Sequence, residues 1–264
     1  MNIAPAPLIT LSNGVQMPQL GLGTWPMNDA EAAETVALAL GMGYRLLDTA
    51  ENYENERGVG EGIRRSGVPR DEVFVTTKFN RKWHSIDGVR QACEASLERL
   101  GLDYIDLFLV HWPNPDQDRY VEAYQGLVKL QEAGLVRAIG TSNFKPTHLQ
   151  RLFDAGLCPQ VNQIHLDPWH ARTDHVEVHE ARGIVTESWS PLGRANAMLA
   201  DPAIGSVMVS NPYVGPPIST MWAKAVSEFT APKPIVYVVH DEDVPLPDEA
   251  AAILRENGVA NALI

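Results

Sequence analysis

Residues 73–112 read VFVTTKFNRKWHSIDGVRQACEASLERLGLDYIDLFLVHW. The apolar run 73–79 is followed by the segment 87–101, in which apolar residues stand three and four positions apart, and then by a second apolar run, 105–112. An early acidic residue and a final glycine in the middle segment are typical of helix ends. The stretch therefore predicts a strand, a helix and a second strand, and the two strands are parallel because a helix connects them.

The same alternation extends in both directions from this stretch. Since no Gly-x-Gly-x-x-Gly follows the first strand, a closed α/β barrel of the TIM type is favoured, with an open α/β sheet as the alternative. Ahead of the strands, Asn13-Gly14 between two short apolar runs predicts a hairpin that caps the barrel. The predicted strands are QLGLGTW (19–25), YRLLDTA (44–50), VFVTTKF (73–79), IDLFLVHW (105–112), VRAIGTSN (136–143), QVNQIHL (160–166) and GIVTESWS (183–190).

The composition excludes several classes of protein. Among 264 residues, 33 acidic side chains outnumber 21 basic ones, and no stretch concentrates Lys and Arg, which argues against nucleic acid or a membrane as partner. Without a signal-like N-terminus or a long apolar run, a cytoplasmic location is expected. Cys93 and Cys158 are predicted to be reduced core thiols. No metal site is predicted, because His175 and His179 in DHVEVHE are expected on a solvated acidic face. The oligomeric state stays open.

Four polar residues follow successive predicted strands. Asp48, Lys78 and His111 end the second, third and fourth strands, and Tyr53 follows in the loop after Asp48. Active sites of such barrels lie where the strands end, so we expect the four side chains to converge. An ammonium lowers the pKa of a neighbouring phenol, and a buried ammonium needs a counter-ion. Each residue alone could be structural, but together they predict a site that protonates a carbonyl oxygen.

The motifs in order resemble those of the aldo-keto reductases, over about residues 8–194. They are GLGTW, LLDTAENYENE, VFVTTKF, LFLVHWP, AIGTSNF, VNQIHLDP and TESWSPLGR. The resemblance implies a (β/α)8 barrel and NADPH-dependent reduction of an aldehyde or ketone. It implies Tyr53 as general acid, Lys78 lowering its pKa, Asp48 paired with Lys78, and His111 orienting the substrate carbonyl.

The resemblance also implies residues that bind the cofactor and the substrate. Ser142, Asn143 and Gln163 would hold the nicotinamide carboxamide, and Trp189 would stack on the nicotinamide ring. The end of the seventh strand and the segment after it add three cofactor-binding candidates, Ser190, Leu192 and Gly193. Trp25 and Trp112 would line the pocket of a small carbonyl substrate. His165 stands where the family usually has Glu.

Beyond Gly193 the sequence departs from the family pattern. The basic residues that grip the 2′-phosphate of NADPH are missing, with Ser210 and Lys224 as poor substitutes, so weak cofactor binding is expected. Residues 195–264 instead resemble a flavodoxin-like fragment of NDP-forming acyl-CoA synthetases. We therefore expect two domains, 1–194 and 195–264, joined as in an engineered chimera, with a divergent natural family member as the alternative. The second domain would add the strands GSVMVS and KPIVYVVH, which makes nine predicted strands in all. The alternative to a carbonyl reductase is a catalytically silent barrel.

Overall fold

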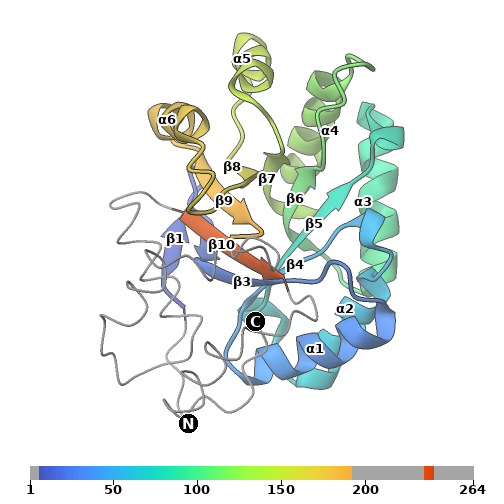
Figure 1. The fold of residues 1–264 in the computed structure, drawn as a ribbon. Coiled ribbons are helices and arrows are strands. Elements are labelled where there is room, and N and C mark those ends of the chain that lie inside the picture. Colours follow the sequence, from blue (N-terminus) through green and yellow to red (C-terminus); the bar gives the residue numbers. More distant parts are fainter. Residues whose placement is uncertain (1–5, 192–234, 241–264) are drawn as a thin grey trace, which may run out of the picture.

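The protein is a parallel barrel surrounded by helices (Figure 1). The computed structural model describes residues 6–191 and the backbone of residues 235–240. All seven strands predicted between residues 19 and 190 form in order. The barrel strands are β3 (Leu20–Gly23), β4 (Leu46–Asp48), β5 (Phe74–Phe79), β6 (Ile105–Val110), β7 (Val136–Ser142), β8 (Val161–His165), β9 (Val185–Trp189) and β10 (Ile235–His240). The helices are α1 (Asp29–Gly41), α2 (Glu56–Ser66), α3 (Ile86–Leu100), α4 (Tyr120–Glu132), α5 (Pro146–Asp154) and α6 (Thr173–Arg182).

Strand β10 closes the barrel. It pairs in parallel with β9 on one side and with β3 on the other, and so joins the last and the first of the seven strands that the alternating pattern predicts. The predicted tail strand KPIVYVVH is therefore a barrel strand, and eight described strands complete the circle. The other tail strand, GSVMVS, lies outside the described residues. So do the boundary at residue 194 and the rest of the flavodoxin-like resemblance.

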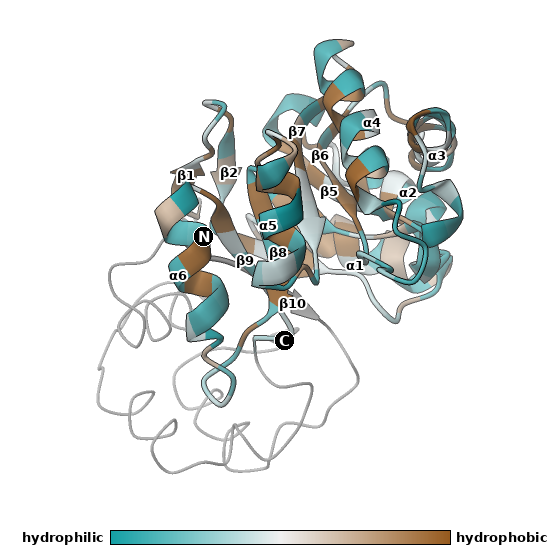
Figure 2. Cartoon of the chain, turned by 90° about the horizontal axis from the view of Figure 1, so that it is seen from above, coloured by the Kyte–Doolittle hydropathy of each residue, from teal (hydrophilic) through white to brown (hydrophobic). Residues whose placement is uncertain are grey.

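The N-terminal hairpin covers the end of the barrel opposite the strand carboxyl ends. Strands β1 (Leu8–Thr10) and β2 (Gln16–Pro18) pair antiparallel around the predicted Asn13-Gly14 turn. Leu11 and Met17 are almost completely buried in a cluster with Leu46, Phe74, Leu107 and other barrel residues. The predicted capping hairpin is therefore confirmed. In Figure 2 the brown of hydrophobic residues lies mainly on the strands and on the sides of the helices that face them.

Two glycines of α2 permit unusually close helix packing. A Cβ atom on Gly58 would lie 2.1 Å from the carbonyl oxygen of Asp29 in α1, and one on Gly60 would lie 1.9 Å from that of Leu100 in α3. Both neighbours are backbone atoms and cannot rotate away. The motif GVG, which resembles part of a phosphate-binding loop, thus serves helix packing and lies within a helix.

Substitution of Gly60 by alanine should therefore weaken the fold. We expect Gly60→Ala to lower the free energy of unfolding by about 3 kcal/mol, because the methyl group overpacks a backbone contact. Urea unfolding followed by circular dichroism measures this. Gly41→Ala is the matched control: no atom lies within 4 Å of a Cβ there, so stability should be unchanged or rise slightly. Equal stability of Gly60→Ala and wild type would contradict the close approach.

Two sequence predictions about buried groups are wrong. Cys158 is exposed, whereas Cys93 is buried as expected. His179 is completely buried behind α6, where Asn162 Nδ2 lies 2.9 Å from its Nε2 and Thr186 Oγ1 lies 2.8 Å from its Nδ1. Burial lowers the pKa of His179 to about 4. It is a neutral core residue that ties α6 to the barrel.

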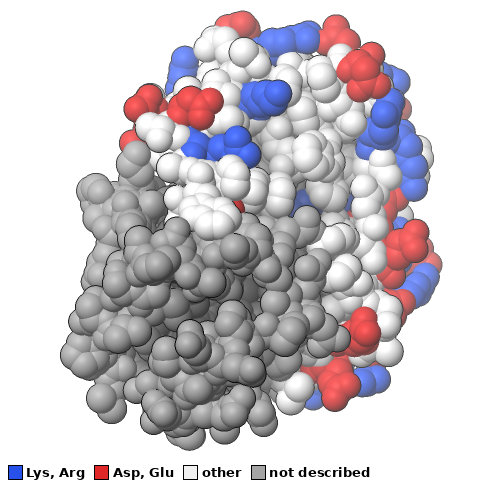
Figure 3. Space-filling model, viewed as in Figure 1, with Lys and Arg blue, Asp and Glu red and all other residues white. Residues whose placement is uncertain are grey.

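The described surface carries charges of both signs. On the face in Figure 3, Lys and Arg side chains alternate with Asp and Glu side chains and form no single-sign patch on the described part. Exposed ion pairs such as Arg90 with Glu94 account for some of this mixing. Among the described residues, no helix has the length and apolar character needed to cross a membrane.

Candidate active site

The structure brings the four predicted catalytic residues together at the carboxyl ends of β4, β5 and β6; this tetrad consists of Asp48, Tyr53, Lys78 and His111. Lys78 Nζ lies 2.6 Å from Asp48 Oδ1, 3.0 Å from the carbonyl oxygen of Thr49 and 3.2 Å from the Tyr53 hydroxyl. Lys78 and Asp48 are completely buried, while Tyr53 and His111 are partly exposed. The Tyr53 and His111 rings meet edge to face, 5.8 Å apart. A phenol, an ammonium and an imidazole therefore lie next to one another at this end of the barrel.

The buried surroundings set the protonation states of these groups. Burial by itself would lower the pKa of Lys78, but the Asp48 carboxylate raises it above its ordinary value, so the ammonium stays charged. Burial, aided by the charge of Lys78, lowers the pKa of His111 to about 3, which leaves its ring neutral. Burial raises the pKa of Tyr53 by more than Lys78 lowers it. The raised pKa of Tyr53 contradicts the expectation that Lys78 lowers it. The phenol therefore stays protonated at neutral pH.

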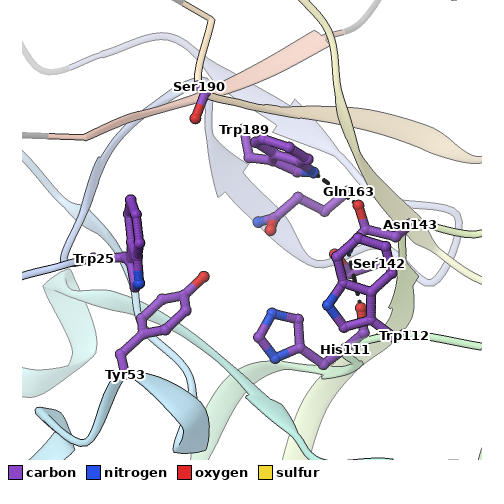
Figure 4. A pocket seen from close by; sticks show the side chains of 9 residues that line it. All are labelled: Trp25, Tyr53, His111, Trp112, Ser142, Asn143, Gln163, Trp189 and Ser190. Atoms are coloured by element: carbon purple, nitrogen blue, oxygen red, sulfur yellow. Dashed lines mark hydrogen bonds between the residues drawn. The ribbon is translucent and has the colours of Figure 1, made fainter. Parts of the chain in front are cut away.

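A cavity of about 180 Å³ opens above Tyr53 and His111. In Figure 4 the Tyr53 hydroxyl and the Gln163 amide point into it, and the indole of Trp189 lies along its edge. Two tryptophans predicted for the substrate pocket also line it: Trp25 is half-buried and Trp112 is exposed. The remaining lining residues are Ser142, Asn143 and Ser190. Leu192 and Gly193, predicted for the cofactor, lie outside the described residues.

Hydrogen bonds fix the side chains on the β7, β8 and β9 side of the cavity. Asn143, whose φ of 63° is in the left-handed region, accepts a hydrogen bond from the Trp189 indole N–H at 3.0 Å. Its amide nitrogen donates to the His111 carbonyl oxygen at 3.1 Å and to Ser142 Oγ at 3.0 Å. Gln163 Nε2 donates to Asp48 Oδ2 at 2.7 Å. This side of the cavity is therefore joined directly to the Asp48 and Lys78 pair.

Comparison with known proteins agrees with this geometry. The sequence pattern of the Aldo/keto reductase family matches residues 17–200, which include all the strands from β3 to β9 and the four residues at the ends of β4, β5 and β6. The chain belongs to the aldo/keto reductase family.

Similar aldo/keto reductases span most of this chain. An aldo-keto reductase of Mycolicibacterium smegmatis is 40% identical over 233 residues, covering 87% of this chain and 84% of its own length. Methylglyoxal reductase DkgA of Yersinia pestis is 48% identical over 200 residues, covering 75% of this chain and 71% of its own. The first match extends beyond residue 194, into the segment for which the sequence suggested another origin.

Solved aldo/keto reductase structures share the fold. The crystal structure of an aldo/keto reductase from Brucella melitensis has a TM-score of 0.79 and 33% identity, and the match covers 98% of this chain and 95% of that one. A Bombyx mori aldo-keto reductase in complex with NADP has a TM-score of 0.71 and 29% identity, with 99% and 95% covered. The predicted barrel class is therefore confirmed.

One buried acid beside the tetrad was not singled out from the sequence. Glu187, on β9, is completely buried in register with Gln163, and neither of its oxygens has a hydrogen-bond partner among the described residues. Burial and then the Asp48 charge raise the pKa of Glu187 to about 8, against the opposing effect of Lys78. Its signal in the sequence is a charged residue inside the predicted strand 183–190.

Glu187 should make stability depend on pH. A carboxyl whose pKa is raised in the folded state favours folding when protonated, so its stabilisation is complete below about pH 4.5 and declines as the pH rises towards 8. We expect the wild type to lose about 2–4 kcal/mol of unfolding free energy from this group across that interval. Glu187→Gln should remove this loss, whereas Glu177→Gln on the exposed side of α6 should keep it. Parallel stability curves for wild type and Glu187→Gln would refute a raised pKa.

Proposed function

We propose that this aldo/keto reductase reduces small aldehydes or ketones with hydride from NADPH and a proton from Tyr53. The observation that carries the proposal is the Lys78 ammonium, held 2.6 Å from Asp48 and 3.2 Å from the Tyr53 hydroxyl at the base of the cavity. Similar proteins support the cofactor and the substrate class. One is solved in complex with NADP, and another is named methylglyoxal reductase.

The residues present suit a bound nicotinamide. A carboxamide carries both a donor and an acceptor, and Ser142, Asn143 and Gln163 offer both kinds of group at the cavity wall. The indole of Trp189 provides a flat apolar surface for a ring, and its N–H bond to Asn143 fixes its orientation. Ser190 borders the same cavity, and Leu192 and Gly193 would continue the cofactor site. When bound, NADPH supplies the hydride.

The chain itself supplies the proton and orients the substrate. Tyr53 donates its hydroxyl proton to the substrate oxygen as negative charge develops there, and the adjacent Lys78 ammonium stabilises the phenolate that remains. Asp48 keeps Lys78 charged and directed towards Tyr53. His111, whose neutral ring lines the cavity, hydrogen-bonds the same oxygen and fixes its position. Trp25 and Trp112 border the space for the rest of the substrate.

Oxidation of NADPH in the presence of methylglyoxal tests the proposal. We expect consumption of NADPH that depends on methylglyoxal and saturates with its concentration. The same assay with NADH, together with calorimetric titration of both cofactors, measures how well the 2′-phosphate is recognised. Binding of NADPH without reduction of methylglyoxal or of other small aldehydes and ketones would overturn the assigned activity. Absence of any NADPH binding would overturn the cofactor assignment and favour the silent barrel considered from the sequence.

A further inference from the structure

The chain between β8 and α6, which Figure 1 shows as a loop, carries with the end of β8 a second cluster of titratable side chains. His165 ends β8, and its ring stacks on Trp189 at 4.5 Å with an interplanar angle of 20°. Its Nε2 lies 3.0 Å from Asp167 Oδ2, and His170 Nδ1 lies 2.8 Å from Asp167 Oδ1. Two imidazoles therefore converge on a single carboxylate.

The two oxygens of Asp167 differ in their surroundings. Oδ1 accepts the backbone N–H groups of Trp169 at 2.9 Å and of His170 at 2.8 Å, which holds the turn in place. Oδ2 is buried, lies 3.0 Å from His165 Nε2 and has no assigned hydrogen bond within the described residues. A buried carboxylate oxygen is costly without a partner. A cation between Oδ2 and the two imidazoles would provide one.

We propose that His165, Asp167 and His170 bind a divalent transition-metal ion of the zinc class. Two imidazoles and one carboxylate are a common zinc ligand set. The three ligand atoms lie within 4.8 Å of one another, and a tetrahedral zinc ion would draw them to separations of about 3.3 Å. His170 is exposed, so water can take the fourth position.

The surroundings limit the strength of this site. The Arg172 guanidinium donates to the His165 carbonyl oxygen at 3.1 Å, and its positive charge opposes a second cation nearby. We therefore expect micromolar rather than tighter binding. His165, Asp167 and His170 lie outside the proposed catalytic group, and zinc binding by them does not depend on carbonyl reduction.

Calorimetric titration with zinc chloride, on the whole chain without a histidine tag, tests the site. At about pH 8 an imidazole with an ordinary pKa is neutral and free to bind metal. We expect one zinc ion per chain. Loss of groups that merely support metal ligands costs about 10- to 100-fold in affinity, so His170→Ala, which removes a ligand, should weaken binding by about a hundredfold or more. Asp167 is left unchanged because it also holds the turn.

His175→Ala is the matched control. His175 also lies beside an acid, with its Nδ1 3.0 Å from Asp174 Oδ1, but it is not in the cluster, so the variant should bind zinc like the wild type. Cobalt(II) titration provides a second measurement, since visible absorption bands typical of four-coordinate cobalt should appear in the wild type and be absent in His165→Gln. Because His170 is exposed, His170→Ala should keep the wild-type melting temperature. Equal zinc binding by wild type and His170→Ala, or equal loss in His175→Ala, would overturn the site.

Discussion

Tyr53→Phe is expected to lower kcat for carbonyl reduction by about a thousandfold. A positioned general acid contributes about 10²- to 10⁴-fold, and the substitution removes the hydroxyl that lies 3.2 Å from Lys78 Nζ while keeping the ring. The raised pKa of Tyr53 means that the wild-type group holds its proton at neutral pH, ready for transfer. Steady-state oxidation of NADPH with methylglyoxal measures the effect.

The control for this experiment is Tyr104→Phe. The Arg70 guanidinium lies over the Tyr104 ring, just before β6 begins, and Tyr104 does not line the cavity. Loss of its hydroxyl should therefore leave kcat unchanged. Tyr53→Phe should also bind NADPH with wild-type affinity and stay folded, with only a small fall in melting temperature, because Lys78 keeps its bonds to Asp48 and to the Thr49 carbonyl oxygen. An unchanged kcat in Tyr53→Phe would mean that another group delivers the proton.

Lys78→Met is expected to damage both activity and stability. It removes the ammonium beside Tyr53, so kcat should fall by about a thousandfold or more. It also leaves the buried Asp48 carboxylate without its partner at 2.6 Å, and breaking a buried ion pair in this way costs about 3–5 kcal/mol. Enzyme kinetics and urea unfolding measure the two effects separately.

A double substitution separates the two causes. When Asp48→Asn is combined with Lys78→Met, the broken ion pair leaves no charge behind. The new amide side chain also keeps an oxygen for the Gln163 amide, which donates to Asp48 at 2.7 Å in the wild type. We expect most of the lost stability to return while kcat stays low. If activity returned with stability, the role of Lys78 would be structural, and the assignment of the tetrad would need revision.

The barrel and the position of the tetrad could be predicted from the sequence because both depend on local patterns. Each strand is a short apolar run, each connection has helical spacing, and parallel strands bring their carboxyl ends to one face. Once the strands were assigned, Asp48, Lys78 and His111 had to lie near one another. The hairpin could be predicted in the same way, from the Asn13-Gly14 turn between two short apolar runs.

The remaining features depend on contacts between distant segments. His179 was expected at the surface because its helix is rich in acids, but its burial depends on how α6 packs against the strands of Asn162 and Thr186. The raised pKa of Glu187 depends on the depth of β9 and on the charge of Asp48. The cluster of His165, Asp167 and His170 depends on a turn in which the Asp167 carboxylate accepts two backbone N–H groups. No clear pattern in the sequence indicates such a turn. Burial also decided the pKa of Tyr53, where reasoning from neighbouring charges gave the wrong direction.

Closure of the barrel by Ile235–His240 has a consequence for protein synthesis. A ribosome releases β3 early and β9 much later, and β10 follows only after a further long stretch of chain. Until then the edges of β3 and β9 that β10 occupies in the finished barrel have no partner on the nascent chain. Open strand edges pair readily with other chains. The interval before residue 240 leaves the ribosome is therefore the period of greatest aggregation risk, and translation that stops early would leave both edges open permanently.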